Sequence, residues 1–197
     1  MKKKKSSRNA SVARRRARAH GERTRTVRGK PNVHPGRAVG ENAKLPPVAK
    51  LFNLLEQEKI PFLIVGMSAA VLQGVPYTTL DTDIWINLPP RNYIRVLNLC
   101  ESLDVQIAAN TVVILPDGTV VNFIYEISGL RSFTTEYRNA TELTWLGKKV
   151  HLLPVDRLLV SKRAAGRPKD VAHLPILEKF LSCQRVTSAK RPVSRKK

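Results

Sequence analysis

The positive charge of this chain is concentrated at its two ends, and that distribution limits which part can fold. Of the formal net charge of +20, residues 1–44 carry +13 and residues 185–197 carry +6, so residues 45–184 are near neutrality. Residues 1–44 contain no Phe, Trp or Tyr, and burial cannot offset the entropy lost on ordering them. The middle segment is long enough to bury a core. We therefore expect one folded domain, residues 45–184, between a disordered basic arm (1–44) and a basic C-terminal tail (185–197).

The basic ends predict a polyanionic partner. Clusters of Lys and Arg neutralise the phosphates of nucleic acids, and this mode of binding depends steeply on salt. The arm has no aromatic side chains on which bases could stack, so we expect little sequence preference. Two other interpretations stay open: a solubilising tail, and an Arg-rich targeting peptide. The four consecutive lysines Lys2–Lys5 argue against the targeting peptide.

The pattern richest in chemistry is a pair of aspartates within an apolar strand. Asp81 and Asp83 lie in the segment 80–88, which is otherwise rich in β-branched and apolar residues. Alternate side chains of a strand project from one face, so the two carboxylates share a face, with Cα atoms about 6.6 Å apart. Such carboxylates repel unless a cation compensates them, and their oxygens suit Mg²⁺ or Mn²⁺. The alternative is a strand edge with two solvated acids.

The residues before this strand add a second pattern. The apolar run 61–65 predicts a buried strand that ends at Gly66, and a short helix follows until Gly74 stops it. Gly66 and Ser68 would form a turn whose backbone N–H groups can face an anion. Gly-x-Ser, a short helix and Asp-x-Asp together resemble the nucleotidyltransferase superfamily, which has the DNA polymerase beta-like fold. The specific similarity is to small bacterial nucleotidyltransferase-like proteins, including toxin-type members.

The resemblance covers about residues 46–182 and implies roles for individual side chains. It implies that Gly66 and Ser68 hold the β- and γ-phosphates of an NTP. It also implies that Asp81 and Asp83 bind Mg²⁺ ions at the site of nucleotidyl transfer.

The chain departs from the family pattern at two positions. Met67 interrupts the turn, where many members have Gly-Gly or Gly-Ser in direct succession. On the strand 119–125, the expected third carboxylate is replaced by Asn122. An amide oxygen can ligate a metal but cannot act as a base, so a second metal should bind more weakly. Glu126 follows about 13 Å along the strand and would substitute only if the strand bends. Both an active transferase and a non-catalytic relative stay open.

The remaining segments predict an α/β (α+β) domain, with a small mixed sheet, helices on one side of it and a C-terminal helix pair. Helices are predicted at 48–55, 91–102, 133–138, 154–165 and 169–183, and hairpins at 111–125 and 141–153. Trp85 shares a face with the two aspartates, where it could flank a nucleotide base, but packing is the commoner role of such a residue.

The joint between the last two helices is the basic cluster of the folded part. Lys162, Arg163, Arg167 and Lys169 could meet a triphosphate or an RNA backbone. We predict Lys162 as a phosphate ligand. The alternative is a solvated helix joint in which Asp170 pairs with Arg167.

These patterns and the resemblance together imply a Mg²⁺- or Mn²⁺-dependent enzyme that moves a nucleotidyl group from an NTP to a hydroxyl. Its catalytic residues would be Asp81, Asp83 and Asn122, and the basic ends favour an acceptor that is RNA or is bound to RNA. One alternative is a non-catalytic module of the same fold that binds nucleic acid or the ribosome. Another is a toxin–antitoxin component whose partner is an antitoxin-like protein.

The chain also carries signals about its compartment. No stretch approaches the roughly 20 apolar residues of a membrane span, so we expect no membrane partner. Cys100 and Cys183 are far apart and lie in helical patterns, which is typical of reduced, packed thiols. We therefore expect a cytoplasmic location.

Overall fold

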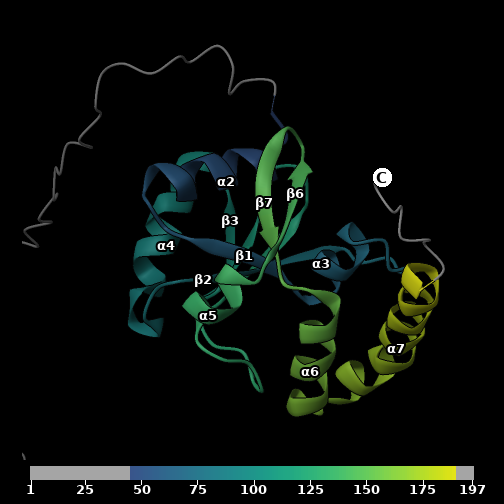
Figure 1. Cartoon of the computed structure of the whole chain (residues 1–197). Coiled ribbons are helices and arrows are strands. Elements are labelled where there is room, and N and C mark those ends of the chain that lie inside the picture. The colour runs from purple at the N-terminus through teal and green to yellow at the C-terminus, as the bar shows by residue number, and fades with distance from the viewer. Residues whose placement is uncertain (1–44, 190–197) are drawn as a thin grey trace, which may run out of the picture. The chain divides into compact units, whose positions relative to one another are not determined.

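A seven-stranded mixed sheet with helices on both sides makes up the part of the chain that the computed structural model describes, residues 45–189. Its strands are β1 (Phe62–Val65), β2 (Asp81–Ile86), β3 (Gln106–Ala109), β4 (Val112–Ile114), β5 (Val120–Ile124), β6 (Thr141–Trp145) and β7 (Lys148–Leu152). Its helices are α2 (Pro47–Gln57), α3 (Gly66–Leu72), α4 (Tyr93–Cys100), α5 (Phe133–Arg138), α6 (Val155–Ala165) and α7 (Pro168–Ala189), with short 3₁₀ helices at Pro90–Asn92 and Glu101–Leu103. Figure 1 shows their arrangement.

The two strands that carry the sequence patterns are neighbours near the centre of the sheet. The strand order is β3-β4-β5-β2-β1-β7-β6. β1 runs antiparallel to β2 and parallel to β7, and β2 runs parallel to β5. All four residues of β1 are buried, as its unbroken apolar sequence predicted. The mixed α/β architecture predicted from the sequence is therefore confirmed.

The prediction that the helices lie on one side of the sheet is wrong. Phe62 and Trp85 lie on opposite faces, because Phe62 pairs with Ile86 and the side chains of a strand alternate. Phe52 of α2 stacks on Phe62 with ring centroids 5.1 Å apart, whereas Phe133 of α5 meets Trp85 edge-on at 5.3 Å. Thus α2 covers one face and α5 covers the other, which is the face of the two aspartates.

The hairpins were predicted correctly, but one strand was missed. β4 pairs antiparallel with β5, and β6 with β7, as the turn signals indicated. β3 was missed because its residues are exposed and its sequence, Gln-Ile-Ala-Ala, has no apolar alternation. β3 lies at the edge of the sheet, and its register with β4 is irregular between Ile107 and Ala109.

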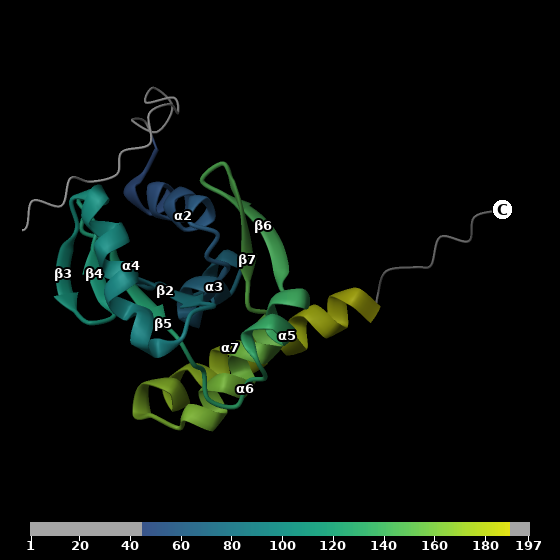
Figure 2. The ribbon, with the colours of Figure 1, turned by 90° about the vertical axis from the view of Figure 1, so that its left-hand side faces the viewer.

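The last two helices form the predicted pair. Gly166, at φ +62°, ends α6, and Pro168 begins α7. Figures 1 and 2 show the two helices side by side after a short turn. α7 continues to Ala189, so its end lies within the segment that was predicted as tail. The arm, residues 1–44, and residues 190–197 lie outside the described residues.

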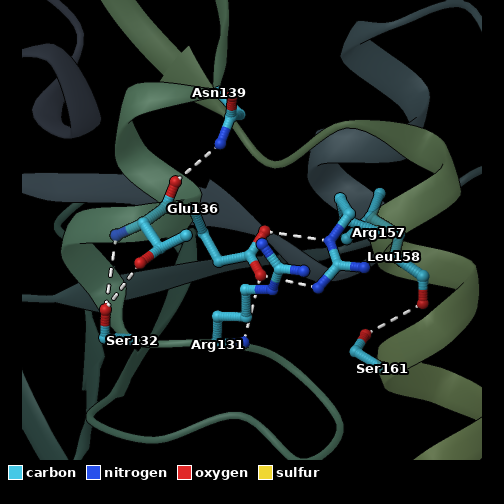
Figure 3. A network of polar contacts seen from close by, with 8 residues as sticks. Arg131, Ser132, Glu136, Asn139, Arg157, Leu158 and Ser161 are labelled. Atoms are coloured by element: carbon cyan, nitrogen blue, oxygen red, sulfur yellow. Dashed lines mark hydrogen bonds and ion pairs between the residues drawn. The ribbon is translucent and has the colours of Figure 1, made fainter.

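A buried ion pair fastens α5 to α6 (Figure 3). The carboxylate of Glu136 is 3 % exposed and accepts hydrogen bonds from both Nε and Nη2 of Arg157, at 3.0 and 2.6 Å. It also accepts one from the backbone N–H of Arg131 at 3.1 Å. These bonds satisfy a charge that would be costly to bury alone. The network therefore fixes α6, which carries Lys162, against the rest of the domain.

No helix within residues 45–189 combines the length and the apolar character needed to cross a membrane. Of the two predicted packed thiols, Cys100 is buried, whereas Cys183 is exposed because its position on α7 faces away from the core.

Candidate active site

The two aspartates lie on one face of β2 beside the end of β1. Asp83 pairs with Val65 of β1 on one side and with Asn122 of β5 on the other. Both carboxylates are half-buried. The structure thus brings together the three residues predicted as catalytic, Asp81, Asp83 and Asn122.

Asn122 donates its amide to both carboxylates. Nδ2 lies 2.9 Å from Oδ1 of Asp83 and 3.4 Å from Oδ2 of Asp81. The opposite orientation of the amide would place its oxygen against two ionised oxygens, so the nitrogen must face them. These hydrogen bonds offset part of the negative charge of the two carboxylates, which we had expected only a cation to offset. The resemblance placed Asn122 on the neighbouring strand, but only the register between β2 and β5 shows that its amide donates to both carboxylates.

Gly66 allows Asp83 to approach the turn that begins α3. Its φ is +64°, which is a left-handed conformation, and a Cβ built on it would lie 1.9 Å from Oδ2 of Asp83. Glycine is therefore required here both by the backbone and by the carboxylate.

Ser68 connects the same turn to the sheet. Its buried hydroxyl donates to the carbonyl of Val65 at 2.9 Å and accepts from the backbone N–H of Asp83 at 3.3 Å. The hydroxyl hydrogen is thus engaged within the fold. Met67, the departure from the family pattern, is buried and packs in the core.

Comparing Gly66→Ala with Gly118→Ala should separate the cost of a left-handed backbone from the cost of displacing Asp83. Gly118, at φ +84°, has no atom within 4 Å of the position that a Cβ would take, so its substitution costs only left-handed strain, about 1–2 kcal/mol. Gly66→Ala adds displacement of Asp83, and we expect a larger loss of unfolding free energy in urea titrations. Equal losses in the two variants would show that Asp83 does not depend on this glycine.

Lys162 and Arg167 are held by one buried carboxylate at the α6–α7 joint. Asp170 is 1 % exposed and accepts from Nζ of Lys162 at 3.0 Å and from Nε of Arg167 at 2.5 Å. The predicted pairing of Asp170 with Arg167 is confirmed, but the joint is not simply solvated, since Lys162 is buried. Arg163 lies elsewhere and pairs with Glu178 at 2.5 Å on the exposed surface.

A cavity of about 360 Å³ joins this cationic pair to the aspartate strand. Gly66, Asp83, Lys162, Arg167 and Asp170 all line it. The acidic residues Asp83, Glu126 and Asp170 and the two cations thus line the cavity, and Gly66 has no side chain to narrow it.

Glu126 also lines this cavity, although strand geometry placed it far from Asn122. β5 ends at Ile124, and the indole N–H of Trp85 donates to the carbonyl of Tyr125 at 2.9 Å where the chain leaves the strand. The strand therefore stops before Glu126, and the sequence did not reveal that Glu126 lies at the cavity wall. Trp85 is buried against Phe133, which is the packing role and not that of a base platform.

The half-buried Asp83 and the buried Asp170 differ in their electrostatics. Burial raises the pKa of Asp83, and the charge of Asp81 raises it further, whereas the hydrogen bond from Asn122 lowers it; the pKa is above its usual value. Burial also raises the pKa of Asp170, but the hydrogen bonds from Arg167 and Lys162 outweigh this effect and hold the pKa below its usual range. A cation near Asp83 would therefore be stabilising, while Asp170 already has its cations.

The carboxylates of Asp81 and Asp83 fit a divalent cation that takes few of its ligands from the protein. Within residues 45–189, no group of three or more His, Cys, Asp or Glu side chains could hold a metal ion. Asp81 and Asp83 nevertheless converge on one positively polarised group, the Nδ2 of Asn122. Two oxygen ligands with the remainder from water and phosphate is a common arrangement for Mg²⁺.

Comparison with known proteins found similar solved structures. LnuA, a lincosamide antibiotic adenylyltransferase bound to lincomycin, shares 12% identity over 67% of this chain and 94% of that chain, with a TM-score of 0.47. The antibiotic-resistance factor ANT(2'')-Ia shares 16% identity over 72% of this chain and 86% of that chain, with a TM-score of 0.48. An antigenic nucleotidyltransferase-like protein from Paracoccidioides brasiliensis shares 19% identity over 68% of this chain and 75% of that chain, with a TM-score of 0.44.

LnuA is described as an adenylyltransferase, and the Paracoccidioides brasiliensis protein as nucleotidyltransferase-like. With TM-scores below 0.5, the similarity decides neither activity nor substrate. No protein-family model and no curated protein sequence matches the chain.

Proposed function

We propose that the chain is a nucleotidyltransferase that uses Mg²⁺ or Mn²⁺ to move a nucleotidyl group from an NTP to a hydroxyl acceptor. The observation that carries this proposal is the shared cavity, which is lined by Asp83 and by the cations Lys162 and Arg167. A triphosphate carries charge that both a metal-bound carboxylate pair and fixed cations can neutralise.

Each residue has a role in this proposal. Asp81 and Asp83 would hold the divalent cation, which when bound neutralises charge on the phosphates. Gly66 leaves the cavity wall open to the phosphate chain, and Ser68 would hold that turn in place through its two hydrogen bonds. Lys162 would contact the phosphates while Asp170 orients it.

The acceptor in this proposal is RNA or is bound to RNA. The support is the charge of +13 in residues 1–44, which lie outside the described residues. We place the reaction in the cytoplasm, where a buried thiol such as Cys100 stays reduced.

A second candidate is a non-catalytic module that binds nucleic acid, the ribosome or an antitoxin-like protein. The observation that favours it is Asn122, whose amide supplies neither the charge nor the base of a carboxylate. This candidate keeps the fold and the basic ends but needs no metal.

The native chain distinguishes the two candidates. It should consume labelled NTP in the presence of Mg²⁺ and total RNA, and chelation of the metal should stop consumption. Transfer of label to the RNA would identify the acceptor. Binding of RNA without consumption of any NTP would reject the transferase and select the module.

Removal of residues 1–44 should weaken RNA binding and flatten its dependence on salt. The logarithm of the association constant changes by about −0.7 to −0.9 per neutralised phosphate for each tenfold change in salt, and +13 of the charge leaves with the arm. Binding measured over a salt series checks this, with circular dichroism confirming that the core stays folded. An unchanged slope would assign RNA binding to the core.

A further inference from the structure

We infer that Asn122 limits this site to a single divalent cation. The inference rests on the proposed function for the presence of a cation, and it concerns how many ions the residues of this chain admit. Its basis is the position of one amide nitrogen between two carboxylates.

The four carboxylate oxygens have unequal surroundings. Oδ1 of Asp81 accepts a short hydrogen bond from the hydroxyl of Thr79, and Oδ2 of Asp81 accepts from Asn122. Oδ1 of Asp83 also accepts from Asn122. Of these four oxygens, only Oδ2 of Asp83 accepts no hydrogen bond from the described residues.

A cation that bridged the aspartates would compete directly with the amide. An ion placed between Oδ1 of Asp83 and Oδ2 of Asp81 would take the place of Nδ2 of Asn122, which already contacts both oxygens. Admitting the ion would break both charge-assisted hydrogen bonds, and a rotated amide could return only a neutral oxygen ligand. A second ion between the two carboxylates would therefore have to displace Asn122, whereas one ion on the cavity side can still use the remaining lone pairs of Asp81 and Asp83.

The free oxygen leaves room for one ion on the cavity side. Oδ2 of Asp83 is the atom that approaches Gly66, and Asp83 and Gly66 both line the cavity. Further positive charge in the cavity comes from Lys162 and Arg167, which are fixed by Asp170.

Electron paramagnetic resonance of Mn²⁺ counts these ions without requiring activity. The native chain, saturated with Mn²⁺ and a non-hydrolysable NTP, should give the signal of one isolated ion per bound nucleotide. A spin-coupled pair of Mn²⁺ ions in the native chain would overturn the inference.

Asn122→Asp tests the cause. A carboxylate in place of the amide should admit a second ion, so the variant should show a coupled pair. Asn139→Asp is the matched control. The Asn139 amide donates to the backbone of α5, so this substitution adds the same charge away from the cavity. A single ion in Asn122→Asp would contradict the inference.

Thermal melting provides a readout if Asn122→Asp folds poorly. Three neighbouring acids should lower the melting temperature in metal-free buffer, and Mn²⁺ should restore it; a loss that Mn²⁺ leaves unchanged would count against the inference.

Failure of the proposed function would give a different result. A native chain that holds one Mn²⁺ but consumes no NTP would remove the transferase and leave the inference intact.

Discussion

Replacing Asp83 with Asn should lower NTP consumption by at least about 100-fold, the scale of losing one charge-stabilising group at a reacting centre. The variant should be as stable as the native chain or more stable, because burial and Asp81 already raise the pKa of the Asp83 carboxyl. An Asn side chain can still accept from Asn122 and carries no charge to bury. Turnover assays and urea titrations on the same preparations would show activity and stability moving in opposite directions.

Asp117→Asn is the control for this substitution. Asp117 lies in the turn between β4 and β5, and its carboxylate accepts from the backbone N–H of Thr119 at 3.0 Å. It changes the net charge by the same amount without touching the cavity, so turnover should not change. Equal activity of Asp83→Asn and the native chain would rule out a role for this aspartate in transfer.

Replacing Arg157 with Met should destabilise the domain by about 3–5 kcal/mol, the usual cost of leaving a buried charge unpaired. Arg157 supplies two of the three hydrogen bonds to the Glu136 carboxylate, which is 3 % exposed. Arg163→Met breaks an ion pair of the same type between half-exposed side chains and should cost less than about 1 kcal/mol. Urea titrations of the two variants test the contrast, and similar costs would show that burial does not decide the strength of these pairs.

The cost of Arg157→Met should depend on pH. The hydrogen bonds from Arg157 hold the pKa of Glu136 below its usual value, so the pair stabilises the fold at neutral pH and loses this effect as pH falls through the folded pKa. Protonation also removes the unpaired charge in the variant. The stability difference between the native chain and the variant should therefore shrink as pH is lowered from 7 toward about 4.

Local patterns predicted the elements apart from β3, and they predicted part of the site. Strand alternation placed Asp81 and Asp83 on one face, and the apolar run before Gly66 marked the buried neighbour of that strand. The turns at Gly118 and Gly166 indicated their elements because glycine adopts a left-handed backbone at low cost. Each of these signals lies within a few residues of the structure that it predicts.

The rest of the site depends on contacts between distant segments. Asp170 reads as a partner for its neighbour Arg167, and only the packing of α7 on α6 shows that it also holds Lys162. Glu126 reaches the cavity because β5 stops at Ile124. The aspartates looked uncompensated because the donor, Asn122, comes from another strand. The spacing of residues in the sequence does not show such contacts between distant segments.

The packing of Trp85 gives the protein an optical reporter beside its cavity. The chain has two tryptophans, and Trp85 lies two positions from Asp83 on the same face of β2. Its indole N–H is bonded to Tyr125, next to the cavity residue Glu126. Trp145 contacts Phe52, on the other side of the sheet from the face of Trp85, with centroids 5.6 Å apart. The tryptophan fluorescence of a Trp145→Phe chain thus comes from Trp85 alone, and we expect it to respond, without a label, to a ligand bound near Asp83.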